Sequence, residues 1–418
     1  MSSVAGSTSE AKIALPPEVW SLIGANAIVA LGYGLVAPVL PDLARHFGVS
    51  ISAATFIITA FAVMRLLAAP PTGLLVQRLG ERRIYISGLA IVAITTAACA
   101  FVNTYWQLLV FRALGGIGST MFFVSALGLM IRISPHDARG RVAGLFAGAF
   151  LVGSVAGPVL GNLTAGLGLR APFLMYGVLL VAAAVVVLVG LRKSALAAPA
   201  DPDELAVTLR VALRHRGYRA ALLSNFATGW SLFGLRFALV PLFVEEVLDR
   251  QPRHVAGLAL AAFAVGNVAV VMYSGRLSDR IGRKPLLIAG LTLSAASTVA
   301  LGMASSLPVF FVEAVIAGAA SGIYASPQQA AVADVIGKAR GGTAIATFQM
   351  MSDFGSIVGS LGVGLIAQQL SFAWAFGISG AILLLAAIGW VLAPETRDEP
   401  AEEPSTQTWD PEAAGELA

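Results

Sequence analysis

The sequence predicts an all-α integral membrane protein with twelve transmembrane helices in two six-helix halves. Three observations support this prediction. The 418 residues are 57% hydrophobic and only 12% charged, whereas charged residues make up about 25% of ordinary soluble domains. Apolar stretches long enough to cross about 30 Å of hydrocarbon as helices recur along the whole chain. The segment 73–83 (GLLVQRLGERR) also recurs 202 positions later as 275–285 (GRLSDRIGRKP).

The apolar runs place the twelve spans in order. The predicted helices cover approximately residues 18–41, 50–72, 84–102, 106–131, 142–168, 171–191, 219–247, 254–275, 285–303, 307–334, 342–369 and 372–393. Six fall in each copy of the repeat, and the sequence AFAV at 60–63 recurs at 262–265 with the same offset. The repeat therefore includes apolar segments as well as charged ones, which favours two copies of one helical bundle.

Basic residues predict which side of the membrane each connection faces. Of the 27 Lys and Arg residues, 20 lie in the tails or in connections after even-numbered helices, and four lie in the opposite connections. Because basic residues in short loops stay in the cytoplasm, we expect a multi-pass protein of the plasma (inner) membrane with both termini cytoplasmic. The basic residues form no aromatic-basic face, so nucleic acid is not an expected partner. The other three, Arg65, Arg112 and Arg236, fall inside predicted helices.

The predicted organisation has five parts. They are a cytoplasmic N-terminal tail (1–17), a first bundle (18–191), a cytoplasmic linker (192–218), a second bundle (219–393) and an acidic C-terminal tail (394–418) that is predicted to be disordered. In the linker, Asp201 and Pro202 begin a predicted short helix along the membrane face. The N-terminal tail lacks the basic region of a signal peptide, so no cleavage is expected. Cys99 is the single cysteine, which allows no intramolecular disulfide.

The repeated charged motif resembles a motif of a known family. Residues 275–284 (GRLSDRIGRK) match the G-x-L-a-D-R-x-G-R-K motif of the major facilitator superfamily, and 73–83 is a degraded copy. The resemblance covers residues 18–393. It implies two six-helix bundles, related by a pseudo-two-fold axis along the membrane normal, that rock about a central site. It also implies that the motif is a tight loop whose charges latch helix ends during alternating access. The motif residues are Gly73, Gln77, Arg78 and Gly80 in the first copy, and Gly275, Asp279, Arg280, Gly282 and Arg283 in the second.

The first copy departs from the family pattern at two positions. Gln77 stands where the acid is expected, and Glu81 stands where a base is expected. A glutamine supplies no fixed negative charge. We therefore expect the charged latch to centre on Asp279, with a weaker neutral contact at Gln77.

The fifth predicted helix carries glycines four positions apart and a proline. Gly153, Gly157, Pro158 and Gly161 resemble the g-x-x-x-G-P-x-x-G motif of exporters in the same superfamily. The alternative is close packing of small residues, which any helical bundle uses. The equivalent stretch in the second half keeps Gly355 and Gly359 but lacks the proline.

Two further segments resemble family motifs. Residues 108–116 (LLVFRALGG) match a motif whose arginine, here Arg112, serves proton transfer or substrate binding; the alternative is that Arg112 reaches toward the membrane surface. The end of the first helix, 32–42 (GYGLVAPVLPD), resembles a motif of twelve-helix drug:proton antiporters. There Asp42 either caps a helix or carries a proton, and Asn26 and Tyr33 are expected to line the cavity.

Two acids fall inside predicted helices, where a charge needs a partner. Glu313 lies in the tenth helix and Asp353 near the middle of the eleventh. Arg65 and Arg236 are candidate partners, and the sequence does not show which residues pair. We favour Asp353 as the proton carrier because Glu313 lies nearer an outer end.

The resemblance places further polar and aromatic residues around a central amphipathic pocket. Besides Asn26, Tyr33, Arg65 and Arg236, these are Asn225, Trp230, Phe233, Tyr324, Gln328, Gln349 and Met350. The four histidines lie apart from one another and from clustered acids, so no metal site is expected. The chain lacks a phosphate-binding G-x-x-x-x-G-K-[ST] loop, so ATP is not the expected energy source.

These observations predict a transporter and not an enzyme. We expect proton-coupled export of a small amphipathic compound such as a drug or metabolite, with no cofactor besides the proton gradient, carried out by a monomer. The alternative is proton-coupled uptake of an organic acid or similar nutrient, which three intramembrane arginines would suit. A membrane scaffold is the outside alternative. At the offset of 202, Arg112 aligns with Ala314, Phe111 with Glu313, Leu151 with Asp353, Gly34 with Arg236 and Arg65 with Asn267. Coupling is therefore expected where the halves differ.

Overall fold

The computed structural model describes residues 15–36, 39–49, 51–163, 167–192, 207–244, 252–337 and 341–397. These residues form helices joined by short turns, and no strand occurs among them. The first half contains α1 (Pro17–Val36), α2 (Leu40–Arg45), α3 (Ile51–Leu79), α4 (Glu81–Ala98), η1 (Cys99–Phe101), α5 (Tyr105–Ile133), η2 (His136–Ala138), α6 (Arg139–Leu163) and α7 (Ala171–Gly190). The second half contains α8 (Leu209–Arg214), α9 (Arg216–Gly229), η4 (Trp230–Leu239), α10 (Val240–Phe243), α11 (Pro252–Ile281), α12 (Lys284–Gly302), α13 (Leu307–Ile336), α14 (Gly342–Gln369) and α15 (Phe372–Leu392).

Ten helices in the described ranges are long and apolar enough to cross a membrane. They match ten of the predicted spans. The other two predictions, 142–168 and 219–247, fall on α6 and on the consecutive segments α9, η4 and α10. A π-helix in η4 divides the latter into three shorter pieces.

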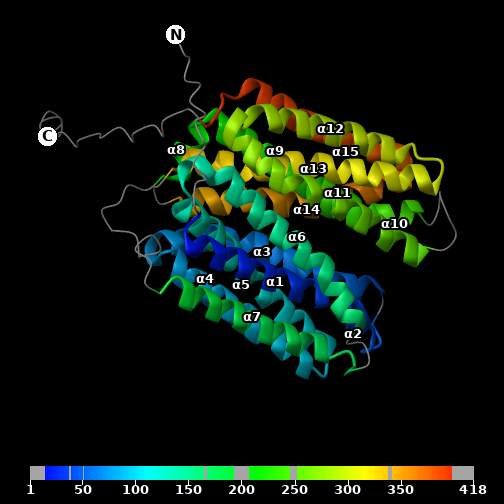
Figure 1. Ribbon diagram of the computed structural model, residues 1–418. Helices are drawn as coiled ribbons and strands as arrows, with labels where there is room; N and C mark the ends of the chain where they lie inside the picture. The colour runs from blue at the N-terminus through cyan, green and yellow to red at the C-terminus, as the bar shows by residue number, and fades with distance from the viewer. Residues whose placement is uncertain are drawn as a thin grey trace, which may run out of the picture.

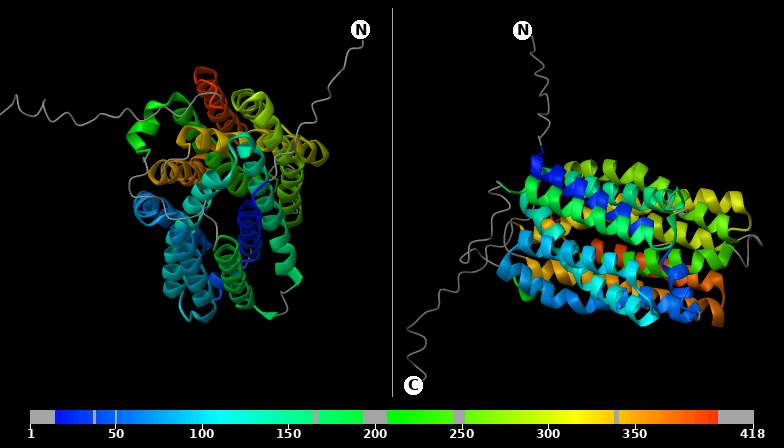
Figure 2. Two further views of the ribbon diagram at one scale, coloured as in Figure 1. Left: turned by 60° about the vertical axis from the view of Figure 1, so that its left-hand side comes forward. Right: turned by 90° about the horizontal axis from the view of Figure 1, so that it is seen from below.

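The two halves lie side by side, with the helices of each half grouped together (Figure 1). Two further views show the long helices running alongside one another (Figure 2). The same packing recurs in both halves: α3 and α4 pack on α5 as α11 and α12 pack on α13, and α1 packs on α6 as α9 and η4 pack on α14. Between the halves, α6 packs on α11 and α3 packs on α14. We call the end that holds the α3–α4 and α11–α12 turns the charged end.

The repeated charged motif is mostly helical, so its prediction as a loop is wrong. Residues 73–79 form the last turns of α3, and residues 275–281 form the last turns of α11. The chain turns only at Gly80 and Gly282, whose φ angles of 82° and 99° lie in the region that favours glycine. Charged residues can continue a helix beyond the membrane, which apolar length alone does not reveal.

Two predictions in the linker and tail need correction. The described linker helix, α8, begins at Leu209 and is capped by the hydroxyl of Thr208, which accepts from the Val211 N–H. The predicted start at Asp201 lies outside the described residues. At the start of the C-terminal tail, Glu395 is held in place because it accepts hydrogen bonds from the backbone N–H groups of Arg283 and Lys284.

The π-helix of η4 accommodates one extra residue. In the first half, the Asn26 side chain donates to the Phe146 carbonyl at 2.8 Å, and Gly34 packs against Gly157. In the second half, Asn225 donates to the Phe348 carbonyl at 2.5 Å, and Gly234 packs against Gly359. These list the paired anchors of each half. The anchors on α6 and α14 are equally spaced, but Asn225 and Gly234 are nine residues apart and Asn26 and Gly34 only eight.

A π-helix has wider i→i+5 turns, so it fits nine residues where an α-helix fits eight. The counterpart of Gly34 is consequently Gly234, and the predicted alignment of Gly34 with Arg236 is wrong. The offset of 202 applies to later helices but not to the first helix of each half.

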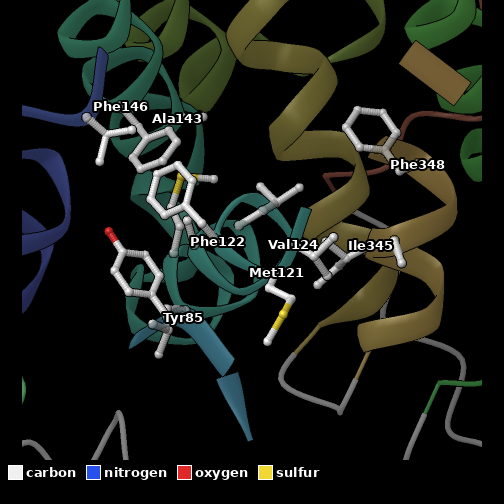
Figure 3. Close-up of a cluster of buried hydrophobic side chains, with 14 of the residues drawn as sticks. Tyr85, Met121, Phe122, Val124, Ala143, Phe146, Ile345 and Phe348 are labelled. Atoms are coloured by element: carbon white, nitrogen blue, oxygen red, sulfur yellow. The ribbon is translucent and has the colours of Figure 1, made fainter. Parts of the chain in front are cut away.

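The hydrophobic core continues from one half into the other near the charged end. One buried cluster joins side chains of α4, α5 and α6 with Ile345 and Phe348 of α14 (Figure 3). A second cluster, which includes Trp230, Phe263 and Phe376, is confined to the second half. The two halves therefore share apolar packing mainly on the side where the charged turns lie.

The paired asparagine bonds make a prediction about stability. Asn26→Ala removes one buried hydrogen bond, whereas Asn225→Ala removes two because its carbonyl also accepts from Gln328 at 2.9 Å. Each bond contributes about 0.5–1.5 kcal/mol. We expect both variants of the purified protein to melt at lower temperature, with the larger decrease for Asn225→Ala. Equal decreases would contradict this reading of the two sites.

Candidate functional site

A buried ion pair joins the two halves between α3 and α14. The Arg65 Nη2 and Nε atoms of α3 each lie 3.1 Å from Oδ1 of Asp353 on α14. Both side chains are nearly buried, with exposed fractions of 12% and 11%. Of the two partners that the sequence offered for Asp353, the structure selects Arg65.

Neighbouring groups hold Arg65 firmly but leave Asp353 partly unsatisfied. Arg65 Nη1 donates to the Ser119 hydroxyl at 2.8 Å, and the guanidinium lies 5.0 Å from the Phe123 ring centre. The Thr120 hydroxyl donates to the Arg65 carbonyl. By contrast, Oδ2 of Asp353 is buried and has no hydrogen-bond partner among the described residues. This oxygen is a ready proton acceptor.

Asp279 forms a latch between the halves at the charged end. Its Oδ1 accepts from the Gly140 N–H at 2.8 Å, and its Oδ2 accepts from the Arg141 N–H at 2.7 Å. These N–H groups belong to the first turn of α6, where they lack intrahelical partners and attract negative charge. Arg283 Nη1 also donates to Asp279 Oδ1 at 2.6 Å. An acid of the second half thus caps a helix of the first.

Asp334 gives the latch a second acid. Its Oδ1 accepts from Arg139 of α6 at 3.1 Å, and its Oδ2 accepts from Arg283 at 3.0 Å, with all three side chains almost fully buried. Burial opposes the charge of Arg283, but the carboxylates of Asp334 and Asp279 outweigh this effect and raise the pKa of Arg283. The network therefore keeps its charges while it stays closed.

The first half contains weaker or reversed versions of these contacts. Gln77 of α3 donates to the Thr343 hydroxyl at 3.1 Å, near the first turn of α14, where the repeat places the counterpart of Asp279. Glu81 pairs with Arg132 at 2.9 Å. At the offset of 202, this pair corresponds to Arg283 and Asp334 with the charges exchanged. The contacts follow the predicted difference between a charged latch and a neutral one.

The other two intramembrane arginines stack on phenylalanines of the AFAV repeat. Arg112 of α5 is buried, and its guanidinium lies 4.6 Å from the Phe61 ring centre. Arg236 of η4 is also buried and lies 3.8 Å from the Phe263 ring centre. Neither has an ion-pair partner among the described residues.

Several predicted cavity residues connect helices of their own half. Asn26 and Asn225 anchor α1 and α9 as described above, and Gln328 bonds to Asn225. The Trp230 indole donates to Ser379 on α15 at 2.9 Å. These bonds favour a packing role for these residues over the predicted cavity role.

The remaining predicted residues fall into three groups. Tyr324 is buried beside Ser321, Gln349 and Met350 are half-buried, and Tyr33 is 39% exposed. Glu313 is half-buried and forms no ion pair with another described residue. Arg78 and Arg280 are exposed at the ends of α3 and α11. The side chains of Asp42, Phe233, Pro158 and Gly161 lie outside the part of the chain that the structure describes.

Glycines bring helices together at two kinds of contact. A Cβ added at Gly153 would lie 2.5 Å from the Ala27 carbonyl, and one added at Gly157 would lie 2.5 Å from the Leu31 carbonyl, so this motif packs α6 on α1. A Cβ added at Gly73 would lie 2.9 Å from the Gly342 carbonyl, and Gly275 opposes Gly140, so the first glycine of each charged motif packs one half on the other.

The sequence reasoning missed Arg139, Asp334 and Ser119. Arg139 resembles the other basic residues near helix ends, and a serine within a helix gives no signal. Asp334 was detectable, because the offset of 202 aligns it with Arg132, a residue of opposite charge. Among the described residues, no group of three or more His, Cys, Asp or Glu side chains is placed to hold a metal ion.

Comparisons with known proteins agree with this architecture. A family model described as Major Facilitator Superfamily matches residues 22–251 and 236–415. Multidrug resistance protein 2 of Bacillus subtilis is 26% identical over 304 residues, covering 70% of this chain and 75% of its own. The class C tetracycline resistance protein of Escherichia coli is 31% identical over 295 residues, covering 68% and 73%. The structure of the human organic anion transporter MFSD10 (TETRAN) aligns with a TM-score of 0.75 at 18% identity, covering 90% of this chain and all of that one.

The latch predicts different effects for the two copies of the motif. Asp279→Asn keeps the shape of the side chain but removes the charge that caps α6 and pairs with Arg283. Hydrogen bonds to charged groups contribute about 1.5–3 kcal/mol each, so we expect a marked loss of transport. Gln77→Ala, the matched change in the first copy, should reduce transport less. Initial rates of dye transport from cells with equal amounts of each variant measure the difference, and equal tolerance of both changes would contradict the latch.

Proposed function

The chain belongs to the major facilitator superfamily, and from this membership we propose that it exports small amphipathic compounds in exchange for protons. In this proposal, twelve helices form two six-helix bundles related by a pseudo-two-fold axis along the membrane normal. The charged end faces the cytoplasm, as its basic residues suggest. The proton gradient across the plasma membrane supplies the energy, and the protein acts as a monomer.

The observation that carries the proposal is the buried Arg65–Asp353 pair between the halves. Asp353 keeps one carboxylate oxygen without a partner. A proton on that oxygen neutralises Asp353 and leaves Arg65 without its counter-charge. Leaving one charge of a buried pair unpaired costs about 3–5 kcal/mol. A shift of a two-state equilibrium from 1:99 to 99:1 needs about 5.5 kcal/mol, so protonation accounts for a large part of such a switch.

The direction of transport rests on two further observations. The Gly157-Pro158 motif of α6 resembles that of exporters, and the relatives named above are drug resistance proteins. The alternative, proton-coupled uptake of an organic acid, is supported by Arg112 and Arg236, which have no acidic partner among the described residues.

An accumulation assay separates export from uptake. The chain is expressed in a host that lacks its own efflux pumps, and dyes, antibiotics and organic acids are followed with and without a protonophore. We expect lower accumulation of at least one amphipathic compound, and we expect the protonophore to abolish this effect. Protonophore-sensitive enhancement of uptake would establish the alternative, and no change for any compound would favour a scaffold.

A substitution in the ion pair tests the proton site. Asp353→Asn keeps the shape but cannot gain or lose a proton, so proton-driven export should fall about tenfold or more, equivalent to a barrier change of at least about 1.4 kcal/mol. Glu313→Gln is the matched control, because Glu313 also lies in a long helix but forms no ion pair with a described residue. Export driven by an imposed pH gradient in proteoliposomes gives the measurement. A larger loss for Glu313→Gln would move the proton site to the tenth predicted helix.

A further inference from the structure

Arg236 of η4 is a buried cation without a protein partner in the described structure. Its side chain is 3% exposed, and its Nε, Nη1 and Nη2 atoms have no hydrogen-bond partner among the described residues. The guanidinium stacks on Phe263, which satisfies one face of the group but none of its N–H donors. A charge within the bilayer ordinarily faces a cavity or a partner of opposite sign.

The guanidinium borders a small closed space in the second half. This cavity has a volume of about 20 Å³, and a water molecule needs about 10–15 Å³ of such space. Apart from Arg236, its lining residues are Val240, Ala259, Leu260, Phe263, Leu301, Phe310 and Ala314. None of them is acidic or polar. The space is too small for a substrate, a phosphate or a sulfate, and it fits one atom or a very small molecule.

Comparison with the first half shows how the cavity arises. There, Arg112 of α5 extends over Phe61, the counterpart of Phe263 in the AFAV repeat. The counterpart of Arg112 on α13 is Ala314, whose short side chain leaves space. Arg236 approaches the same phenylalanine from the π-helix of η4 instead. π-helical turns are rare and frequently occur at functional sites.

We propose that this cavity binds a chloride ion held by the Arg236 guanidinium. A water molecule would accept hydrogen bonds but would leave the positive charge uncompensated in an apolar surrounding, which is costly. A monatomic anion supplies both the charge and the acceptor in the space available. The weak hydration of the guanidinium favours such a pairing. This ion stabilises the second half, and the inference is independent of the direction or energy source of transport.

Thermal unfolding of the purified full-length protein tests the proposal. The melting temperature is measured in sodium chloride, sodium bromide and sodium gluconate at equal ionic strength. Since gluconate is too large for the cavity, we expect a melting temperature about 2 °C or more higher in chloride and in bromide. Equal values in all three salts would show that the cavity holds water or nothing, and would overturn the proposal.

Three variants locate the effect. Arg236→Met keeps the length of the side chain without its charge and should lose the halide dependence, and Ala314→Val should lose it by filling the cavity while Arg236 remains. Arg170→Gln is the matched control, because this exposed arginine of the first half donates to the Val102 carbonyl away from the cavity, and it should keep the full dependence. Halide dependence that persists in Arg236→Met would overturn the site. If Arg236→Met fails to fold, Ala314→Val decides by the same criterion.

Discussion

The two halves are held together by charges that neither half neutralises by itself. Arg65 of the first half needs Asp353 of the second, the first turn of α6 needs Asp279, and Arg139 needs Asp334. All of these contacts cross the interface between the halves. A buried charge is costly when it loses its partner, so the interface favours a small number of fully paired arrangements over gradual separation. This property suits a transporter that alternates between discrete states.

The duplication explains which contacts can change. Glu81–Arg132 and Arg283–Asp334 are the same ion pair with exchanged charges, and each pair lies within its own half. The pair of the first half is complete, whereas Asp334 also accepts from Arg139 of the other half. The second half therefore supplies both acids of the latch. A charge exchange that is neutral within one half thus produces an asymmetric interface between the two.

Much of the fold and part of the site could be predicted from the sequence. Apolar length and the repeat located ten described spans, and Asp353, Arg65 and Asp279 stood out because charges are rare in such a chain. The pairing of Asp353 with Arg65 could not be predicted, because it depends on how the halves meet. The register of η4 could not be predicted either, since a fixed offset does not detect one inserted residue between Asn225 and Gly234. Asn225 and Trp230 were expected in a cavity because they are polar or amphipathic, but hydrogen bonds between packed helices satisfy the same groups.

The positions of the contacts determine where separation of the halves begins. The α6–α11 side of the interface carries the charged latch of Asp279, whereas the α3–α14 side carries only the neutral Gln77–Thr343 bond at the same end. The Arg65–Asp353 pair lies on that same α3–α14 side. In the proposed mechanism, a proton on Asp353 therefore weakens the side that is already held less strongly, while Asp279 still fixes α6 to α11. Opening then starts between α3 and α14 and turns about the α6–α11 contact, so one proton acts where the least additional energy is needed.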